Sequence, residues 1–340
     1  MYTHLLVPLD GSERAERAVP VAERIARTTG GRITLLQVIN LPMPLGAPYD
    51  AAALSAYSFE QTEAEAASYL ARVAGWPLLN GVRVETEVVT GAPAATVLDI
   101  AREKQADLIV ICSHGRTGAT RWMLGSVAEH IARQSLVPVL ILREQGAVPA
   151  HPHPDPLQPM RILVPLDGSL FAEAALAPAA QLILALAGPE QAALHLALAL
   201  PPYEMDRENV PNTLALDGAR AYLMRTADRM RGTYPQLRVS WSVTSDVDVA
   251  QALLRVAETG DEVGTGPGST SDMIAMATHG RSGIIRWALG STTERVLHGT
   301  KLPLLIVRPA AAAQQDVPAV RPTEASQPPH EVDAPWPALF

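Results

Sequence analysis

The chain has 340 residues, a formal net charge of −8 at pH 7 and 48% hydrophobic residues, which predict an acidic protein with about two buried cores. Nucleic-acid-binding proteins are more often basic, with clustered Lys and Arg side chains, so this composition argues against that class. Cys112 is the only cysteine, which excludes an internal disulfide and favours a reducing compartment.

The chain also lacks the patterns that send or anchor a protein outside the cytoplasm. Its N-terminal stretch has no basic leader followed by an apolar core, so it does not resemble a signal peptide. The most apolar region, residues 176–200, is interrupted by the polar turn at residues 188–191. Neither half reaches the roughly 20 residues that cross a bilayer. We therefore expect a cytoplasmic protein without a membrane segment.

Strands and helices alternate along the first part of the chain. Ser12 is a favoured helix N-cap residue after the first strand, and Gly30 ends the helix that follows. Residues 40–58 hold three prolines and a glycine, which predicts a loop. The predicted strands are residues 4–9, 33–39, 82–89, 108–113 and 139–142, and the predicted helices are residues 12–29, 59–74, 94–104 and 127–134.

The second part repeats this order after a proline-rich linker at residues 144–159. Residues 260–271 are rich in Gly, Ser and Thr and are predicted to be a flexible insertion. Residues 310–340, rich in Ala, Pro and Gln, are predicted to be disordered. The predicted strands are residues 162–166, 193–200, 237–243, 273–278 and 304–307, and the predicted helices are residues 171–187, 216–231, 247–258 and 292–298.

Short repeated segments, one of them identical in both copies, indicate that the two parts are a duplication. Alternating strands and helices predict right-handed crossovers and a mostly parallel sheet with helices on both faces. We therefore predict two doubly wound, Rossmann-like α/β domains at residues 1–143 and 160–309. The repeated segments are residues 7–12 and 164–169 (VPLDGS in both), 121–126 and 286–291 (RWMLGS, RWALGS), and 138–143 and 303–308 (PVLILR, PLLIVR).

The repeated VPLDGS segment places a carboxylate at the carboxyl end of the first strand of each copy. Ligands of doubly wound sheets bind at this edge, where the strand order reverses. Asp10 and Asp167 are therefore candidates to accept hydrogen bonds from a ribose or an adenine amine. The alternative is that Asp10 caps the next helix, although Ser12 is already available as its cap.

The second repeated feature is a long glycine-bearing loop between a strand and a helix, at residues 107–127. Gly115 has no Cβ and lets backbone approach a ligand closely, while Ser126 can cap the helix. Free N–H groups at a helix start attract anions, so the loop is a candidate phosphate site. Nine residues separate Gly115 from Gly125, as nine separate Gly280 from Gly290 in the second copy.

Other polar residues near these loops are given structural roles. Arg116, Arg121, Arg281 and Arg286 are expected to be solvated, and His114 and His279 to brace the loops. Cys112 is expected to be a buried small residue, because the sequence fixes no base beside it. No metal site is predicted.

Taken together, these motifs resemble the universal stress protein family, with two UspA-type domains in tandem. The nucleotide motif of that family is a glycine, two residues, a glycine, nine residues and Gly-Ser or Gly-Thr. Here Cys112 and Ala277 stand at its first glycine, while Gly115, Gly125 and Ser126, like Gly280, Gly290 and Ser291, match the rest. Each replacement adds a side chain where backbone passes close to the nucleotide.

The resemblance implies a fold similar to the adenine-nucleotide alpha-hydrolases, with five-stranded parallel sheets in the strand order 3-2-1-4-5 and pairing of the two domains through their last strands. It implies ATP, with or without Mg²⁺, as the ligand. By this resemblance the ligand-binding residues are Pro8, Asp10, Val38, Cys112, Gly115, Gly125, Ser126 and Val127 in the first copy and Pro165, Asp167, Ala197, Ala277, Gly280, Gly290, Ser291 and Thr292 in the second.

The function expected from these features is ATP binding in a cytoplasmic stress-response protein that regulates rather than catalyses. The expected partners are an adenine nucleotide and the second domain of the same chain, with a further homodimer left open. One alternative is a slow ATP-hydrolysing enzyme, although no pair of carboxylates supports it. The other is a nucleotide-free scaffold of the UspA type, which is favoured if Cys112 and Ala277 close the pockets.

Overall fold

The computed structural model describes most of the chain except for several connecting segments and the C-terminal stretch. The expected tail at residues 310–340 lies outside the described residues, as do residues 114–123 and 279–288 of the two glycine loops. The described residues are 2–40, 49–113, 124–143, 149, 155, 158–201, 213–260, 270–278 and 289–309.

The first half of the chain alternates strands and helices as predicted. Among its described residues are five strands, five helices and one short 3-10 helix, η1 (Pro77–Leu79), which was not predicted. The elements are β1 (His4–Leu9), α1 (Glu13–Glu16), α2 (Ala18–Thr29), β2 (Arg32–Ile39), α3 (Tyr49–Ala74), β3 (Arg83–Thr90), α4 (Pro93–Glu103), β4 (Leu108–Cys112), α5 (Ser126–Gln134) and β5 (Val139–Leu142).

The second half repeats the same order of elements. They are β6 (Met160–Pro165), α6 (Leu170–Glu173), α7 (Leu176–Ala187), β7 (Ala192–Leu200), α8 (Thr213–Thr233), β8 (Arg238–Ser245), α9 (Val249–Thr259), β9 (Met273–Ala277), α10 (Ser291–Gly299) and β10 (Leu304–Val307).

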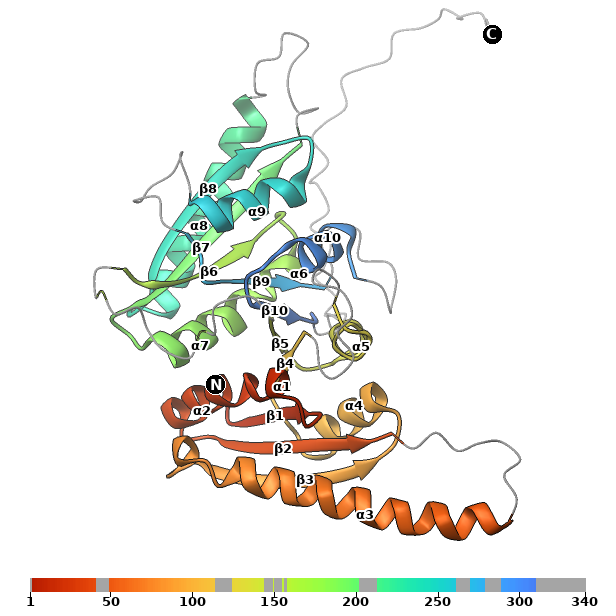
Figure 1. Ribbon diagram of the computed structural model, residues 1–340. Coiled ribbons are helices and arrows are strands. Elements are labelled where there is room, and N and C mark those ends of the chain that lie inside the picture. Colours follow the sequence, from red (N-terminus) through yellow and green to blue (C-terminus); the bar gives the residue numbers. More distant parts are fainter. Residues whose placement is uncertain are drawn as a thin grey trace, which may run out of the picture. The chain divides into compact units, whose positions relative to one another are not determined.

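All ten strands belong to one sheet with the order β3-β2-β1-β4-β5-β10-β9-β6-β7-β8 (Figure 1). Within each half the strands are parallel and follow the order 3-2-1-4-5 that the resemblance implied. The two halves meet where β5 and β10 pair antiparallel, with Leu305 opposite Leu140. The predicted α/β fold is confirmed, and the two predicted sheets are joined into one.

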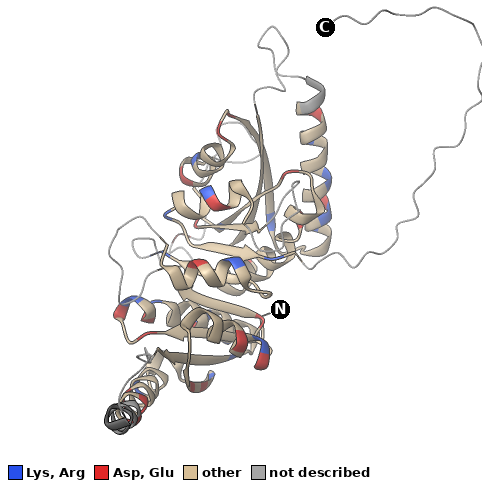
Figure 2. Ribbon diagram, turned by 90° about the vertical axis from the view of Figure 1, so that its right-hand side faces the viewer, with Lys and Arg blue, Asp and Glu red and all other residues tan. Residues whose placement is uncertain are grey.

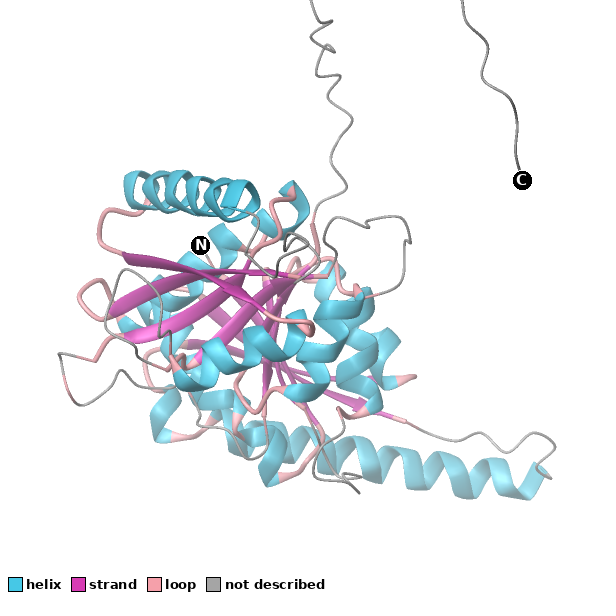
Figure 3. Cartoon of the chain, turned by 90° about the horizontal axis from the view of Figure 1, so that it is seen from above, coloured by secondary structure: helices cyan, strands magenta, loops and turns pink. Residues whose placement is uncertain are grey.

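The central strands are apolar on both sides, which is why they lie in the middle of the sheet. Every residue of β4, β5, β9 and β10 is buried, a pattern typical of parallel strands covered on both faces. Helices cover the two faces of the sheet (Figure 3). One core cluster contains side chains of α2 and α7, and the other contains side chains of α4, α5, α9 and α10.

Two proline residues explain why the helix after the first strand of each half is broken. A single helix was predicted in each half, but the structure has α1 and α2, and α6 and α7. A helical proline clashes with the carbonyl group four residues before it. Pro20 and Pro178 therefore exclude a regular helix through Glu16 and Ala174, and the chain turns at these residues.

The first helix–loop boundary after β2 was predicted too far along the chain. The three prolines and the glycine suggested a loop up to residue 58, but α3 already begins at Tyr49. The prolines end at Pro48, and the alanine-rich segment that follows has a high intrinsic helix propensity. As a result α3 is a long helix, and Figure 1 shows it running along β3.

Among the described residues, one stretch, Leu170–Ala187, has the length and mean hydropathy of a membrane span. It is divided between α6 and α7, and Leu182, Ile183 and Leu186 of α7 are fully buried in the core. This burial accounts for its apolar composition. Figure 2 shows acidic and basic residues interspersed on the helices in that view, rather than collected in a patch of one sign.

Candidate functional site

The first part of the site is the Asp-Gly-Ser turn that follows β1. Gly11 has a φ of 85°, a left-handed conformation that favours glycine. The Asp10 Oδ1 atom accepts hydrogen bonds from the Ser12 backbone N–H at 3.0 Å and from the Ser12 hydroxyl at 2.6 Å. Ser12 in turn caps α1 by accepting from the Ala15 N–H at 3.2 Å, as predicted.

The second half builds the same turn with nearly the same distances. Gly168 has a φ of 83°, and Asp167 Oδ1 accepts from the Ser169 N–H at 2.9 Å and from its hydroxyl at 2.6 Å. In both halves, therefore, one oxygen of the strand-end aspartate orients the capping serine. The alternative that the aspartate itself caps the next helix is wrong, because Ser12 and Ser169 are the N-cap residues. The aspartate instead accepts hydrogen bonds from the capping serine, and these bonds hold the carboxylate at the strand end.

The start of α5 differs from the prediction in one respect. Gly125, with φ −63° and ψ 144°, is the N-cap residue, and Ser126 is the first residue of the helix rather than its cap. Among the described residues, no side chain caps this helix start. The Gly125 N–H donates to the Ser113 carbonyl at 2.8 Å. The N–H groups of Ser126, Val127 and Ala128 belong to the first turn of the helix and so have no intrahelical acceptor.

The turn and the helix start face one cavity of about 430 Å³ at the carboxyl ends of β1 and β4. The cavity brings together seven of the eight residues expected in the first copy; the eighth, Gly115, lies outside the described residues. The seven residues are Pro8, Asp10, Val38, Cys112, Gly125, Ser126 and Val127.

Several lining residues were not singled out from the sequence. Gln37 precedes Val38 on β2 and Asn40 follows the end of that strand, while Pro93 and Val97 come from the first two turns of α4. These four follow from the rule that ligands sit beyond the carboxyl ends of parallel strands. Thr62 comes from α3, and its place in the lining depends on how α3 packs, which the sequence pattern does not give.

A smaller cavity, of about 230 Å³, occupies the equivalent place in the second half. Gly280 lies outside the described residues. Six residues expected in the second copy line the cavity: Pro165, Asp167, Ala277, Gly290, Ser291 and Thr292.

The remaining expectation, Ala197, was wrong by two positions. Pro165 pairs with Ala197 in the sheet just as Pro8 pairs with Leu36, so the counterpart of Val38 is Ala199. Ala199 lines the second cavity, whereas Ala197 is fully buried in the core. Only the strand register distinguishes these residues, because both side chains project from the same face.

Larger side chains help to account for the smaller size of the second cavity. Leu253 of α9 stands at the position of Val97 in α4, and Thr293 of α10 stands at the position of Ala128 in α5. Thr293 is buried, and its hydroxyl donates to the Ala277 carbonyl at 3.0 Å. The two cavities are therefore formed by equivalent strands and helices but differ in volume.

Cys112 lines the first cavity as a neutral thiol. Its residue is 9% exposed, and burial raises the pKa of the thiol to about 12. A thiolate is the nucleophilic form of cysteine, and little of it is present at neutral pH with this pKa. The expectation that Cys112 is a small buried residue rather than a nucleophile agrees with this environment.

A comparison with protein-family models decides the affiliation. The model described as the universal stress protein family matches residues 1–143 and 159–308, which is most of the chain. The chain belongs to the universal stress protein family. The two matched segments are the two halves of the sheet, so this universal stress protein carries the family domain twice.

Individual relatives support this affiliation along nearly the whole chain. A universal stress protein of Mycolicibacterium smegmatis is 26% identical over 317 residues, which covers 90% of this chain and 97% of the relative. One of Mycobacterium bovis is 28% identical over 233 residues, or 66% of this chain and 69% of the relative. A solved universal stress protein from Archaeoglobus fulgidus shares the fold, with a TM-score of 0.57 at 21% identity and coverage of 90% and 96%.

Proposed function

We propose that this universal stress protein binds an adenine nucleotide, foremost ATP, in the cavity of the first half. The observation that carries the proposal is the convergence of Asp10 and the start of α5 on one cavity of about 430 Å³. That volume lies within the usual range of about 300–1,000 Å³ for small-molecule sites. A carboxylate acceptor together with the backbone N–H groups of a helix start fits a ligand with a sugar and a phosphate chain.

The polar groups suggest how the nucleotide lies. The N–H groups of Ser126, Val127 and Ala128 begin α5, where the helix dipole adds partial positive charge, so this end suits the phosphates. Asp10 suits a ribose hydroxyl or the adenine amine. Val38, Pro93 and other apolar lining residues suit the faces of the adenine ring.

The unequal cavities lead us to propose that the first half binds nucleotide more tightly than the second. The second cavity keeps Asp167 and the start of α10 but has about half the volume, at 230 Å³. A nucleotide there would require side chains such as Leu253 and Thr293 to move. We therefore expect close to one tightly bound nucleotide per chain, with or without Mg²⁺.

We further propose that nucleotide occupancy regulates a stress response in the cytoplasm, and that the two halves act as an intramolecular pseudo-dimer. Support for the pairing comes from the antiparallel contact of β5 with β10. An apolar edge strand left bare invites association with other chains, so each last strand gains from a partner. A further homodimer through another surface remains compatible with this arrangement.

The decisive experiment measures nucleotide content. The purified full chain is denatured, and released nucleotide is identified by mass spectrometry and counted per chain. Titration calorimetry with ATP, ADP and AMP then gives affinity and stoichiometry for protein freed of nucleotide. Absence of both bound nucleotide and binding heat would favour the nucleotide-free scaffold, and ATP turnover well above background would favour the enzyme.

A pair of matched variants assigns the binding to one half. Asp10→Asn removes the charge but keeps an oxygen that can accept from Ser12, so the turn should persist. Asp167→Asn makes the same change in the second half. We expect Asp10→Asn to weaken ATP binding and Asp167→Asn to leave the tight site unchanged. The reverse pattern would place the site in the second half.

A further inference from the structure

A second cavity of the first half lies at the opposite edge of the sheet, where the strands begin. It has a volume of about 580 Å³ and is lined by the first residues of three neighbouring strands, His4 of β1, Arg32 of β2 and Arg83 of β3. Arg27 near the end of α2 and the backbone at Gly81 complete its wall. It shares no lining residue with the cavity proposed to bind the nucleotide.

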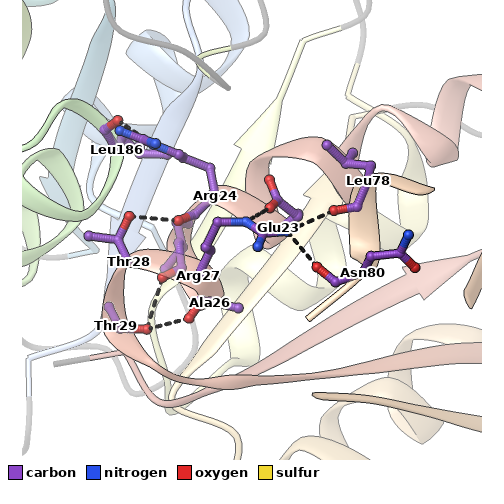
Figure 4. A network of polar contacts seen from close by, with 10 residues as sticks. Glu23, Arg24, Ala26, Arg27, Thr28, Thr29, Leu78, Asn80 and Leu186 are labelled. Atoms are coloured by element: carbon purple, nitrogen blue, oxygen red, sulfur yellow. Dashed lines mark hydrogen bonds and ion pairs between the residues drawn. The ribbon is translucent and has the colours of Figure 1, made fainter. Parts of the chain in front are cut away.

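Arg27 lines the cavity, and its positive charge is neutralised by an ion pair with Glu23. Glu23 is buried, and the Nη2 atom of Arg27 donates to the carbonyl oxygens of Leu78 at 2.9 Å and Asn80 at 3.0 Å (Figure 4). These contacts fasten η1 to α2 and so fix the position of Gly81. Arg27 therefore contributes shape to the cavity rather than net charge.

Arg32 and Arg83 contribute positive charge to the cavity. They are register partners on neighbouring strands, so the two side chains leave the same face of the sheet side by side. Like charges in this relation destabilise a sheet unless something lies between them. Within the described part of the chain, neither arginine forms an ion pair with Asp or Glu.

The contacts of Arg32 leave it short of acceptors. Its Nη2 atom lies 3.0 Å from His4 Nδ1, but the same nitrogen lies 2.9 Å from the Lys104 carbonyl oxygen. One ring nitrogen cannot accept from a guanidinium and donate to a carbonyl at the same time. The Nε atom of Arg32 is buried and has no hydrogen-bond partner among the described residues.

We propose that this cavity binds a phosphate group, held between the Arg32 and Arg83 guanidiniums. A phosphate can accept hydrogen bonds from both guanidinium groups that line the cavity, and it separates the two like charges. Guanidinium groups suit it because their planar forks make paired, charge-assisted hydrogen bonds to such oxyanions. The bound molecule is either inorganic phosphate or the phosphate group of a larger molecule, for which 580 Å³ leaves room.

The duplicated half supplies an internal comparison. Arg238 begins β8 as Arg83 begins β3, but its register partner on β7 is Ala193, which takes the place of Arg32. The pair of adjacent arginines thus exists only in the first of the two halves at these positions. Arg238→Gln is therefore a matched control for Arg83→Gln.

The test follows phosphate binding at this edge of the sheet. Inorganic phosphate is titrated into full-length protein labelled with ¹⁵N-glycine, and the amide signals of Gly30, Gly31 and Gly81, which flank the cavity, are recorded. We expect these signals to shift in the wild type. Arg83→Gln and Arg32→Gln should each weaken the apparent affinity at least tenfold, and Arg238→Gln should leave it unchanged.

Further arms separate the alternatives. If glycerol 3-phosphate binds at least tenfold more tightly than inorganic phosphate, the ligand is a phosphate ester. If the two bind with equal affinity, the ligand is the free ion. Both outcomes support the phosphate site. Arg83 is exposed, so Arg83→Gln remains a valid test if Arg32→Gln fails to fold. Unmoved glycine signals, or undiminished phosphate affinity in Arg83→Gln, would overturn the proposal. The two arginines would then act only by stabilising the partial negative charge at the C-terminal end of α2.

Discussion

Arg133 of α5 donates a hydrogen bond from Nη2 to Glu294 Oε1 of α10 at 2.7 Å, and so links the two halves of the chain. The same nitrogen lies 2.9 Å from Glu129 on its own helix. Glu129 and Glu294 occupy equivalent positions of the two halves, four residues after Gly125 and Gly290. One arginine therefore bridges two carboxylates that the duplication brings together.

The first prediction tests this link. Arg133→Gln should lower the free energy of unfolding by about 1 kcal/mol, because the pair is partly solvated and such pairs contribute little. The loss should shrink in high salt, which screens the two carboxylates that remain. Chemical denaturation at low and high salt measures both effects. Arg102→Gln, which removes an exposed pair with Asp99, is the control, and equal losses in both variants would contradict a linking role.

The second prediction concerns the helix starts in the two proposed nucleotide sites. Gly125 and Gly290 have φ of −63° and −58° with extended ψ, a conformation that valine adopts readily. The change Gly125→Val with Gly290→Val should therefore preserve the fold. The branched side chains enter the cavity lining and should weaken ATP binding about a hundredfold, the equivalent of two lost charge-assisted hydrogen bonds.

Calorimetric titration of ATP beside a melting curve measures both parts of this prediction. The single variants assign the loss: Gly125→Val alone should remove the tight site, and Gly290→Val alone should leave it. Undiminished affinity in the double variant would show that the nucleotide binds elsewhere. Loss of the cooperative transition would show that the glycines are needed for folding.

The third prediction concerns Cys112. With a thiol pKa of about 12, the thiolate fraction at pH 8 is about one in ten thousand, compared with about a quarter for an ordinary cysteine. Ellman's reagent should therefore label the native protein far more slowly than the unfolded protein, which should show one thiol per chain. Rapid labelling of the native protein would mean that Cys112 is exposed to solvent.

The fourth prediction concerns the buried residue His4. Burial, followed by the nearby Arg32 guanidinium, lowers the pKa of His4 below its usual value of 6.5, against smaller opposing effects of the Lys104 carbonyl, Glu85 and Asp107. Below pH 6.5 the unfolded chain therefore binds a proton at His4 before the folded chain does. The contribution of His4 to the free energy of unfolding should therefore be constant above pH 6.5. It should fall as the pH drops from 6.5 toward the lowered pKa of the folded protein.

The slope that His4 contributes is at most about 1.4 kcal/mol per pH unit, because one proton is involved. His4→Gln should flatten the pH dependence of the unfolding free energy in this window, measured by urea denaturation. His298→Gln, which changes an exposed histidine of α10, is the control. An unchanged pH dependence in His4→Gln would show that the pKa of His4 is the same in the folded and unfolded chains.

Local sequence patterns were sufficient for most of the architecture. Apolar strand runs, the capping serines and glycine helix ends are determined by neighbouring residues, so the alternation of elements and the duplication were predictable. Asp10 and Gly125 could be assigned to one site because the carboxyl ends of parallel strands share one edge. The boundaries were less predictable: Pro20 broke a helix, and α3 began at Tyr49.

Tertiary structure alone decided which residues from distant segments meet. The register of β7 against β6 selected Ala199 over Ala197, and the packing of α3 brought Thr62 to the cavity. The pairing of Arg32 with Arg83 likewise depends on how β2 lies beside β3. A sequence pattern repeats every two residues in a strand and so fixes which face a side chain occupies, but not its neighbour on the next strand. That neighbour is set by contacts across the whole sheet.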